Sequence, residues 1–158
     1  MALNPSKVGS TYPTYRYEVS REKIREYALA LGENDPRYLS DGDDCVAPPT
    51  FAASFTLTKG LMALLGDAEL GAHPALVHGS QAFRWGARPV RPGDVLECTP
   101  RIASITARGR NEFLATVVDC RFAGTDELAV EAESVIVFLG SAPQDDAAEQ
   151  GGAQGGAA

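Results

Sequence analysis

Proton-exchanging side chains gather in one short polar segment, residues 33–44, which is rich in Asp, Gly and Pro. Glu33 and Asp35 are carboxylates of the kind that serve as general bases. Tyr38 follows three residues later, but a phenol stays protonated at neutral pH and exchanges its proton poorly there. The same residues also suit a plain loop, because Asp before Pro favours a turn. Tyr38 would then pack its ring and leave its hydroxyl in water.

The remaining reactive side chains indicate neither a metal site nor a disulfide framework. Cys45, Cys98 and Cys120 are odd in number, far apart and without a C-x-x-C pair. Cys98 and Cys120 fall inside strand-like runs, which favours a role as small core residues. His73 is expected in a solvent-facing loop and His78 in a strand, where a structural role is favoured over a catalytic one. We therefore expect no metal and no cofactor.

Composition limits the classes of protein to which this chain can belong. Its 158 residues suit one domain, and 44% hydrophobic with 22% charged residues is ordinary for a globular protein. A net charge of −7 argues against nucleic acid as the main partner, because phosphate binding needs clustered Lys and Arg. No apolar run approaches the ~20 residues of a membrane span, and no signal peptide is recognisable. We expect a cytoplasmic protein that has no contact with the membrane.

Two helices are expected before any long strand. A short β-like stretch covers 14–19, and Ser20 is placed to cap a helix over 21–31 that Gly32 ends. The second helix is predicted over 51–65, capped by Thr50 after two prolines and ended by Gly66. Because it is apolar nearly all round and Lys59 is its only charge, we expect it to be buried.

Four strands are predicted from a period of two, over about 76–86, 94–107, 112–123 and 128–139. In the third, alternate residues from Leu114 to Phe122 share one face. In the fourth, Glu131 and Glu133 oppose the face of Val130 and Phe138. The pattern indicates an α+β domain over 1–140, with one long antiparallel sheet around one buried helix. Residues 141–158, mostly Gly, Ala, Gln and Asp, are expected to be a disordered tail.

Two motifs resemble those of the MaoC-like dehydratases, which have the hot-dog fold. Residues 32–38 read GENDPRY, similar to the family's active-site loop, Gly-Asp-x-Asn-Pro-x-His. Residues 89–96 read PVRPGDVL, similar to the family's Pro-Val-x-Pro-Gly-Asp-x-Leu turn, and fall where a hairpin is expected. In this turn Gly93 supplies a permissive backbone position and Asp94 can bond backbone N–H groups. The likeness covers residues 10–140 and implies a single hot-dog domain.

The resemblance implies a hydro-lyase that adds or removes water across a 2-enoyl thioester, yet the active-site positions differ here. Glu33 stands for the family's Asp, Asp35 for its Asn and Tyr38 for its His. The family also activates the thioester carbonyl with a backbone N–H at the start of the central helix. Pro48 and Pro49 stand there, and proline has no N–H to give. Losing one such donor typically costs about 100- to 1000-fold in rate.

These departures resemble one subgroup, the non-catalytic subunit of heterodimeric (3R)-hydroxyacyl-acyl-carrier-protein dehydratases of fatty-acid elongation. Residues 47–51 and 21–28 carry this likeness. It implies a tunnel-forming chain that pairs with a MaoC-like catalytic partner and has no intact catalytic residue. The residues that it implies for binding the acyl thioester are Ala47, Pro48, Pro49, Thr50, Phe51 and Phe55.

Other functions stay open at this point. One is a homodimeric hydratase that uses Glu33, and another is a non-enzymatic protein that binds acyl thioesters. A hot-dog thioesterase is disfavoured, because such enzymes usually carry a carboxylate on or next to the central helix and residues 51–65 contain none. The sequence names neither the acyl length nor the carrier, which is acyl carrier protein or coenzyme A. It also leaves open whether the dimer is homo- or heteromeric.

Overall fold

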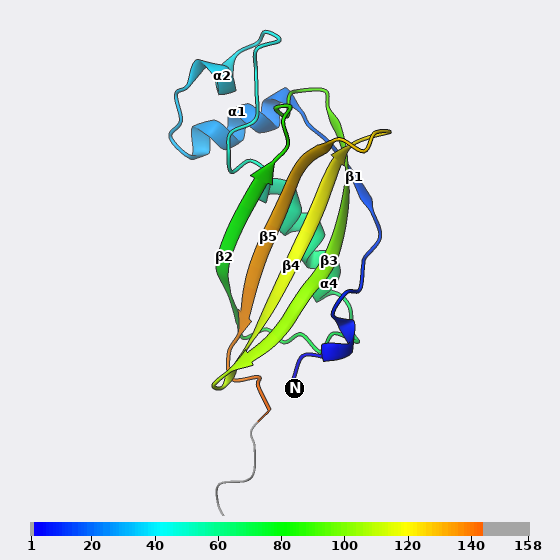
Figure 1. The fold of residues 1–158 in the computed structure, drawn as a ribbon. Coiled ribbons are helices and arrows are strands. Elements are labelled where there is room, and N and C mark those ends of the chain that lie inside the picture. Colours follow the sequence, from blue (N-terminus) through cyan, green and yellow to red (C-terminus); the bar gives the residue numbers. More distant parts are fainter. Residues whose placement is uncertain (1, 144–158) are drawn as a thin grey trace, which may run out of the picture.

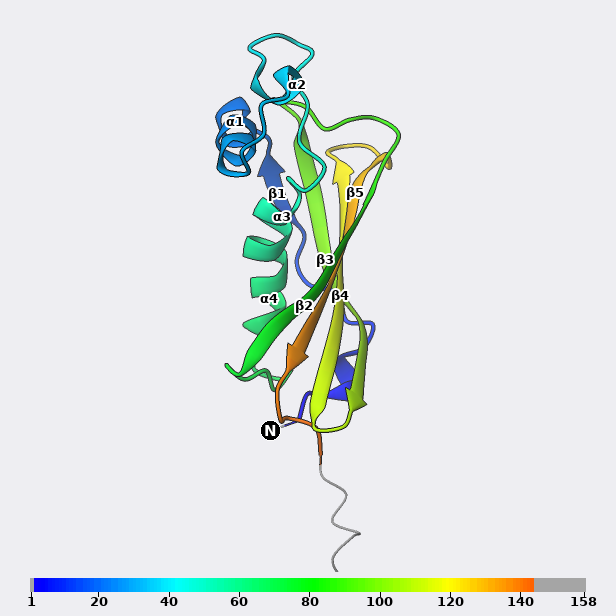
Figure 2. The ribbon, with the colours of Figure 1, turned by 90° about the vertical axis from the view of Figure 1, so that its left-hand side faces the viewer.

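The computed structural model describes residues 2–143, which form one antiparallel sheet curved around a central helix (Figures 1 and 2). The sheet has the strand order β1-β3-β4-β5-β2, and every neighbouring pair is antiparallel. The strands are β1 (Tyr15–Glu18), β2 (Leu76–Trp85), β3 (Val95–Arg108), β4 (Asn111–Phe122) and β5 (Leu128–Phe138). The helices are α1 (Arg21–Ala30), α2 (Pro36–Leu39), α3 (Ala53–Phe55) and α4 (Met62–Leu65), with a 3-10 turn at Pro5–Lys7 and a π-helix at Thr56–Leu61.

The local predictions are confirmed where one side-chain pattern decides the structure. The four long strands lie within one residue of the predicted bounds, and alternate residues of β4 and β5 are buried as expected. The Ser20 side chain caps α1 by accepting a hydrogen bond from the Lys23 backbone N–H, and Gly32 has φ +74°. Cys45, Cys98 and Cys120 are free and buried. The α+β architecture follows from these elements.

The second predicted helix differs in its start and its cap. It begins at Ala53, because residues 48–51 first make a tight turn in which the Phe51 N–H donates to the Pro48 carbonyl. The Thr50 hydroxyl does not cap the helix and instead accepts from the Tyr27 hydroxyl. We call Ala53–Leu65, which comprises α3, the π-helix and α4, the central helix.

The central helix is buried on only one side, contrary to the expectation of burial all round. Starting from Ala52, the residue just before the helix, buried positions recur every four residues, at Thr56, Gly60 and Leu64. Phe51 and Phe55 are buried beside them. The wide π turn keeps this four-residue stripe on the sheet, and Gly60 sits where an added Cβ would lie 2.7 Å from Val118. Its other flank faces away from the sheet, and there Met62 is 59% exposed.

The motif at 89–96 forms a turn, but it does not belong to a hairpin. Gly93 has φ +88°, and the Asp94 carboxylate accepts from the Arg91 backbone N–H at 2.7 Å, as predicted. However, β2 and β3 are not neighbours, so the segment between them carries the chain from one edge strand toward the other side of the sheet. A hairpin was expected because the two strands are consecutive, and consecutive strands pair more often than not.

The two ends of the described chain both pack against the start of β4 and the turn before it. The buried Glu112 carboxylate accepts two hydrogen bonds from the Leu3 backbone N–H. Ser141 and Ala142, which were assigned to the tail, are buried, and the Ala142 N–H donates to the Arg110 carbonyl. Residues 144–158 of the predicted tail lie outside the described residues. Among residues 2–143, no helix is both long and apolar enough to cross a membrane.

Candidate functional site

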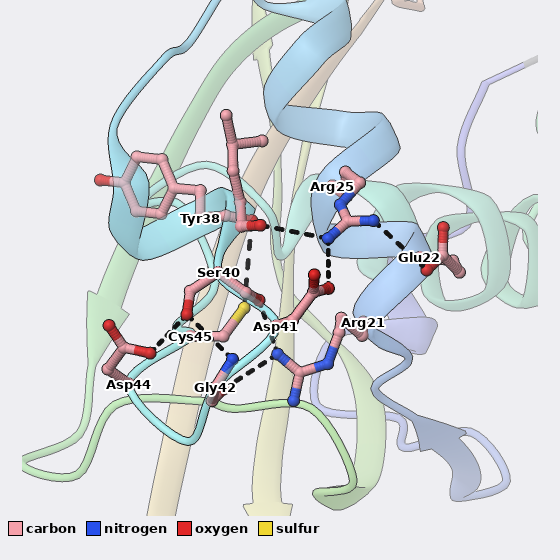
Figure 3. Close-up of polar contacts among 10 residues, drawn as sticks. Arg21, Glu22, Arg25, Tyr38, Ser40, Asp41, Gly42, Asp44 and Cys45 are labelled. Atoms are coloured by element: carbon pink, nitrogen blue, oxygen red, sulfur yellow. Dashed lines mark hydrogen bonds and ion pairs between the residues drawn. The ribbon is translucent and has the colours of Figure 1, made fainter.

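Two arginines of α1 hold the loop that carries the predicted acid–base residues (Figure 3). The Arg21 guanidinium donates to the carbonyl oxygens of Ser40 and Gly42 at 2.7 and 3.0 Å. The Arg25 guanidinium donates to the Leu39 carbonyl at 3.1 Å and pairs with the Asp41 carboxylate at 2.5 Å. Because these contacts fix main-chain atoms, the loop is positioned by α1 and not by its own side chains alone.

Asp35 serves the loop as a helix cap. Its carboxylate accepts from the Arg37 backbone N–H at 2.9 Å, at the start of α2, and forms an ion pair with the Arg37 guanidinium at 2.6 Å. The guanidinium first, and then the backbone N–H, hold the pKa of Asp35 below its usual value of 3.8. Asp35 is therefore ionised at neutral pH and fully engaged in local structure.

This contact predicts an acid-dependent loss of stability. Since the pKa of Asp35 is lowered in the folded chain, its contribution is present above the usual pKa and is lost as pH falls through the folded value. Asp35→Asn should therefore reduce the stability difference between neutral pH and the range below 3.8, measured by urea unfolding at each pH. Asp126→Asn, a change at an exposed loop carboxylate, is the control. An acid dependence that is equal in both variants would contradict the prediction.

Tyr38 and Glu33, the predicted partners in acid–base chemistry, are placed in different surroundings. Tyr38 is half-buried against the apolar core cluster that contains Phe51, Phe55 and Val118, which we call the upper cluster. The Arg37 guanidinium lies 5.9 Å from the centroid of the Tyr38 ring. Its hydroxyl points away from the two arginines of α1 (Figure 3). Glu33 is exposed just beyond α1, where its backbone N–H donates to the Ala28 carbonyl. Tyr38 lines the pocket described next, whereas Glu33 does not.

A pocket of about 320 Å³ opens beside this loop, at the end of the sheet where β2 finishes. Its walls come from the loop, from the turn before the central helix and from the segment after β2. The Trp85 indole N–H donates to the Pro49 carbonyl at 2.9 Å and joins two of these walls. The lining residues are Arg37, Tyr38, Val46, Ala47, Pro49, Trp85, Gly86, Ala87, Arg88, Pro89 and Val90.

Of the six residues predicted to bind substrate, two line this pocket, three are buried and one is exposed. Ala47 and Pro49 line the pocket, and Pro48 is buried behind them. Thr50 is exposed, and its carbonyl accepts from the Tyr27 hydroxyl at 2.8 Å. Phe51 and Phe55 are buried in an aromatic cluster, where the Phe55 ring stacks on Tyr17 at 4.3 Å and the Phe51 ring meets Tyr27 edge-on at 5.6 Å.

Sequence reasoning missed Trp85 and Arg88 as pocket residues. Trp85 lies in the predicted strand over 76–86, and its residue type alone does not separate a core residue from a pocket residue. Arg88 lies over the Phe122 ring at 3.4 Å and pairs with Asp94 at 3.0 Å, which ties the pocket wall to the motif at 89–96. The signal that could have found them is their position, since Arg88 immediately precedes that motif and Trp85 lies four residues before it.

Two other cavities of the described chain each have one titratable residue among their described lining residues. One, of about 380 Å³, lies over β3, β4 and β5 and is lined by Arg108, and the other, of about 250 Å³, is lined by His73. His73 accepts from the Ala75 backbone N–H and packs against Phe138, and His78 is exposed on β2. Among residues 2–143, no three His, Cys, Asp or Glu side chains lie where they could hold a metal ion together.

Known proteins similar to this chain agree on one family. The model for the FAS1-like, dehydratase domain region matches residues 6–132. UPF0336 protein SCO4636 of Streptomyces coelicolor is 44% identical over 124 residues, which cover 72% of this chain and 81% of that protein. A UPF0336 protein of Streptomyces griseus is 40% identical over 150 residues and covers 87% of this chain and 95% of its own length.

Solved structures show the fold. A chain of the HadBC (3R-hydroxyacyl-ACP dehydratase) complex of Mycobacterium tuberculosis aligns with a TM-score of 0.69 at 24% identity, covering 83% of this chain and 96% of that one. A MaoC-like dehydratase aligns with a TM-score of 0.72 at 20% identity, covering 85% of this chain and 42% of that one. A chain of the ChsH1-ChsH2 complex, also from M. tuberculosis, gives 0.59 at 14% identity and covers 85% and 87%. The chain is therefore a hot-dog protein that belongs to the FAS1-like dehydratase-region family, together with the UPF0336 proteins.

Proposed function

We propose that this chain is the substrate-holding, catalytically silent subunit of a dehydratase that acts on (3R)-hydroxyacyl thioesters in fatty-acid metabolism. One observation carries the proposal. Among residues 2–143, Arg37, Tyr38 and Arg88 are the only titratable side chains that line the pocket, and these residues bring neither a carboxylate nor an imidazole to it. Removing water from a hydroxyacyl thioester needs a group that both takes and gives a proton near neutral pH. These three side chains do not supply one.

The start of the central helix supports the same proposal. A donor for the thioester carbonyl would have to come from a backbone N–H at residues 48–49, and both are prolines. The surrounding wall is otherwise suited to holding an acyl thioester, since Val46, Ala47, Pro49 and Val90 present apolar surface. The chain binds substrate, in this proposal, and leaves the chemistry to a second chain.

The free edge of the sheet supports a partner subunit. β2 pairs with β5 on one side only, and it runs for ten residues along the edge of the sheet (Figure 1). Such an edge presents unpaired N–H and C=O groups that readily pair with another strand. The HadBC and ChsH1-ChsH2 structures are complexes of two different chains. We infer that the partner is a MaoC-like hot-dog chain with an intact Asp/His loop.

The direct test is to assay hydration of a trans-2-enoyl thioester by the chain alone and after co-expression with a MaoC-like partner. The expected result is turnover in the complex and, for the lone chain, a rate lower by at least 100-fold. The chain with Glu33→Gln serves as the matched control and should leave the rate of the complex unchanged. Strong turnover by the lone chain that Glu33→Gln abolishes would replace the proposal with a homodimeric hydratase. Binding without turnover in every pairing would leave a non-enzymatic acyl binder.

A further inference from the structure

Three polar side chains form a row across the inner face of the sheet. Gln81 of β2 lies opposite Ser134 of β5, and Ser134 lies opposite Thr116 of β4. All three share the face of the buried apolar residues of these strands. Ser134 and Thr116 are only 5% and 2% exposed. We call these three residues the polar row.

The polar row is held by hydrogen bonds within the sheet. The Ser134 hydroxyl donates to the Gln81 side-chain carbonyl at 2.7 Å, and the Gln81 amide donates to the Glu133 main-chain carbonyl at 2.8 Å. The Thr116 hydroxyl points to the Ser134 carbonyl at 3.5 Å. The polar groups are therefore satisfied where they stand, and any group that displaced them would leave buried polar atoms without partners.

This row separates the two apolar clusters of the core. On the pocket side, the next residues on the same face are Phe83, Ala132 and Val118, of which Phe83 and Val118 belong to the upper cluster. On the other side they are Leu114 and Ile136, which belong to the lower cluster. A polar line between two apolar clusters is not explained by packing alone, because apolar residues there would join them into one core.

The inner face of β2 runs from the pocket to the row, and we call its line of side chains the path. Trp85 lines the pocket, and Phe83 and Gln81 follow it at two-residue intervals on the same face of the strand. All three are only half-buried in this chain, since β2 is the edge strand. Four residues of extended strand span about 13 Å. The side chains along the path are thus the aromatic rings of Trp85 and Phe83, followed by the Gln81 amide.

We propose that the polar row ends the path of the acyl chain and so limits the acyl length that this subunit accepts. The inference rests on the proposed function, because the thioester end of the substrate must occupy the pocket. Acyl chains that stop short of Gln81 lie against Trp85 and Phe83. Longer chains must press methylenes onto the row, which lowers affinity by about 10-fold or more when a buried hydrogen bond is lost.

The test measures binding of acyl-pantetheine probes with butyryl, octanoyl, dodecanoyl and hexadecanoyl chains to the full-length chain, alone and with a co-purified partner. Affinity should rise with length and then stop rising or fall at one probe. The double variant Gln81→Leu, Ser134→Ala makes the row apolar and should move this break to a longer probe, with about a 10-fold gain for that probe. Gln81→Met, a milder change, should move it in the same direction. Ser80→Leu, on the opposite face of β2, is the matched control.

The outcomes separate this inference from the proposed function. A break that stays at the same probe in both variants, or no break at all, overturns the inference even if the complex turns over enoyl thioesters. Absence of binding at every length overturns it as well. Failure of turnover in every pairing overturns the proposed function alone, because a shifted break in the binding series still supports the polar row as the limit.

Discussion

Replacing Gly86 with alanine should prevent the chain from folding stably. A Cβ added at Gly86 would lie 1.8 Å from the Leu128 carbonyl oxygen and 2.8 Å from its carbonyl carbon. Both are backbone atoms at the start of β5, and the Gly86 N–H itself donates to the Ala129 carbonyl at 2.9 Å. Neither strand can withdraw without breaking the β2–β5 pairing. Ordinary overpacking costs ~1–3 kcal/mol. We expect a larger cost here because the clash is with backbone atoms, and the whole free energy of unfolding of a domain is only about 5–15 kcal/mol.

The measurement is urea unfolding followed by circular dichroism. Gly124→Ala is the comparison, because Gly124 also ends a strand but nothing lies within 4 Å of its added Cβ. Because Gly124 has φ +75°, an alanine there is strained, and we expect this strain alone to cost about 1–2 kcal/mol. If Gly86→Ala unfolds at the same urea concentration as the unchanged chain, the packing at the β2–β5 end has been described wrongly.

Placing a lysine at position 62 should weaken association with the partner subunit without affecting the fold. Met62 lies on the flank of the central helix that does not face the sheet, and it is 59% exposed in the single chain. Met62 is the large apolar side chain that this flank exposes, so it is the position at which a partner that covers the flank would bury the most apolar area. A buried charge without a counter-ion at such an interface costs roughly 2 kcal/mol or more, so the Kd should rise at least about 30-fold.

Analytical ultracentrifugation or titration calorimetry with the co-expressed partner measures this change. Val8→Lys is the matched control, since Val8 is also an exposed apolar residue but belongs to the segment before β1 and not to the central helix or β2. The two lysine variants should have equal melting temperatures in isolation. Equal affinity of Met62→Lys and Val8→Lys for the partner would show that the exposed flank of the central helix is not part of the interface.

The strands could be predicted because their signal is local. Alternation along residues 112–123 requires only that one face be buried, and β4 has that pattern. Strand order could not be predicted in the same way, because the placement of β2 beside β5 depends on residues fifty positions apart. The central helix is apolar on nearly every side, so its sequence pattern alone could not show which side packs against the sheet. The π turn at Thr56–Leu61, which places Thr56, Gly60 and Leu64 on the buried side, has no signal in that pattern.

The candidate site could be predicted only in part. The motif at 32–38 located the loop, and Asp35 before Pro36 indicated the turn that it caps. No sequence pattern indicates the arginines that hold this loop, because Arg21 and Arg25 bind carbonyl oxygens and any residue has a carbonyl. The pocket itself joins residues 37–49 with residues 85–90, and such a meeting is decided by the chain path and not by a local pattern.

The π turn also lets the central helix absorb one change in chain length. An α-helix advances by about 100° per residue, and a π turn takes up one extra residue so that the residues after it keep their side. Removing one residue from 56–61 would give the buried stripe the spacing of an ordinary α-helix, with Leu64 still on the sheet and Met62 still on the exposed flank. A deletion elsewhere in the helix would instead turn the residues after it by about 100° and change the surface offered to a partner.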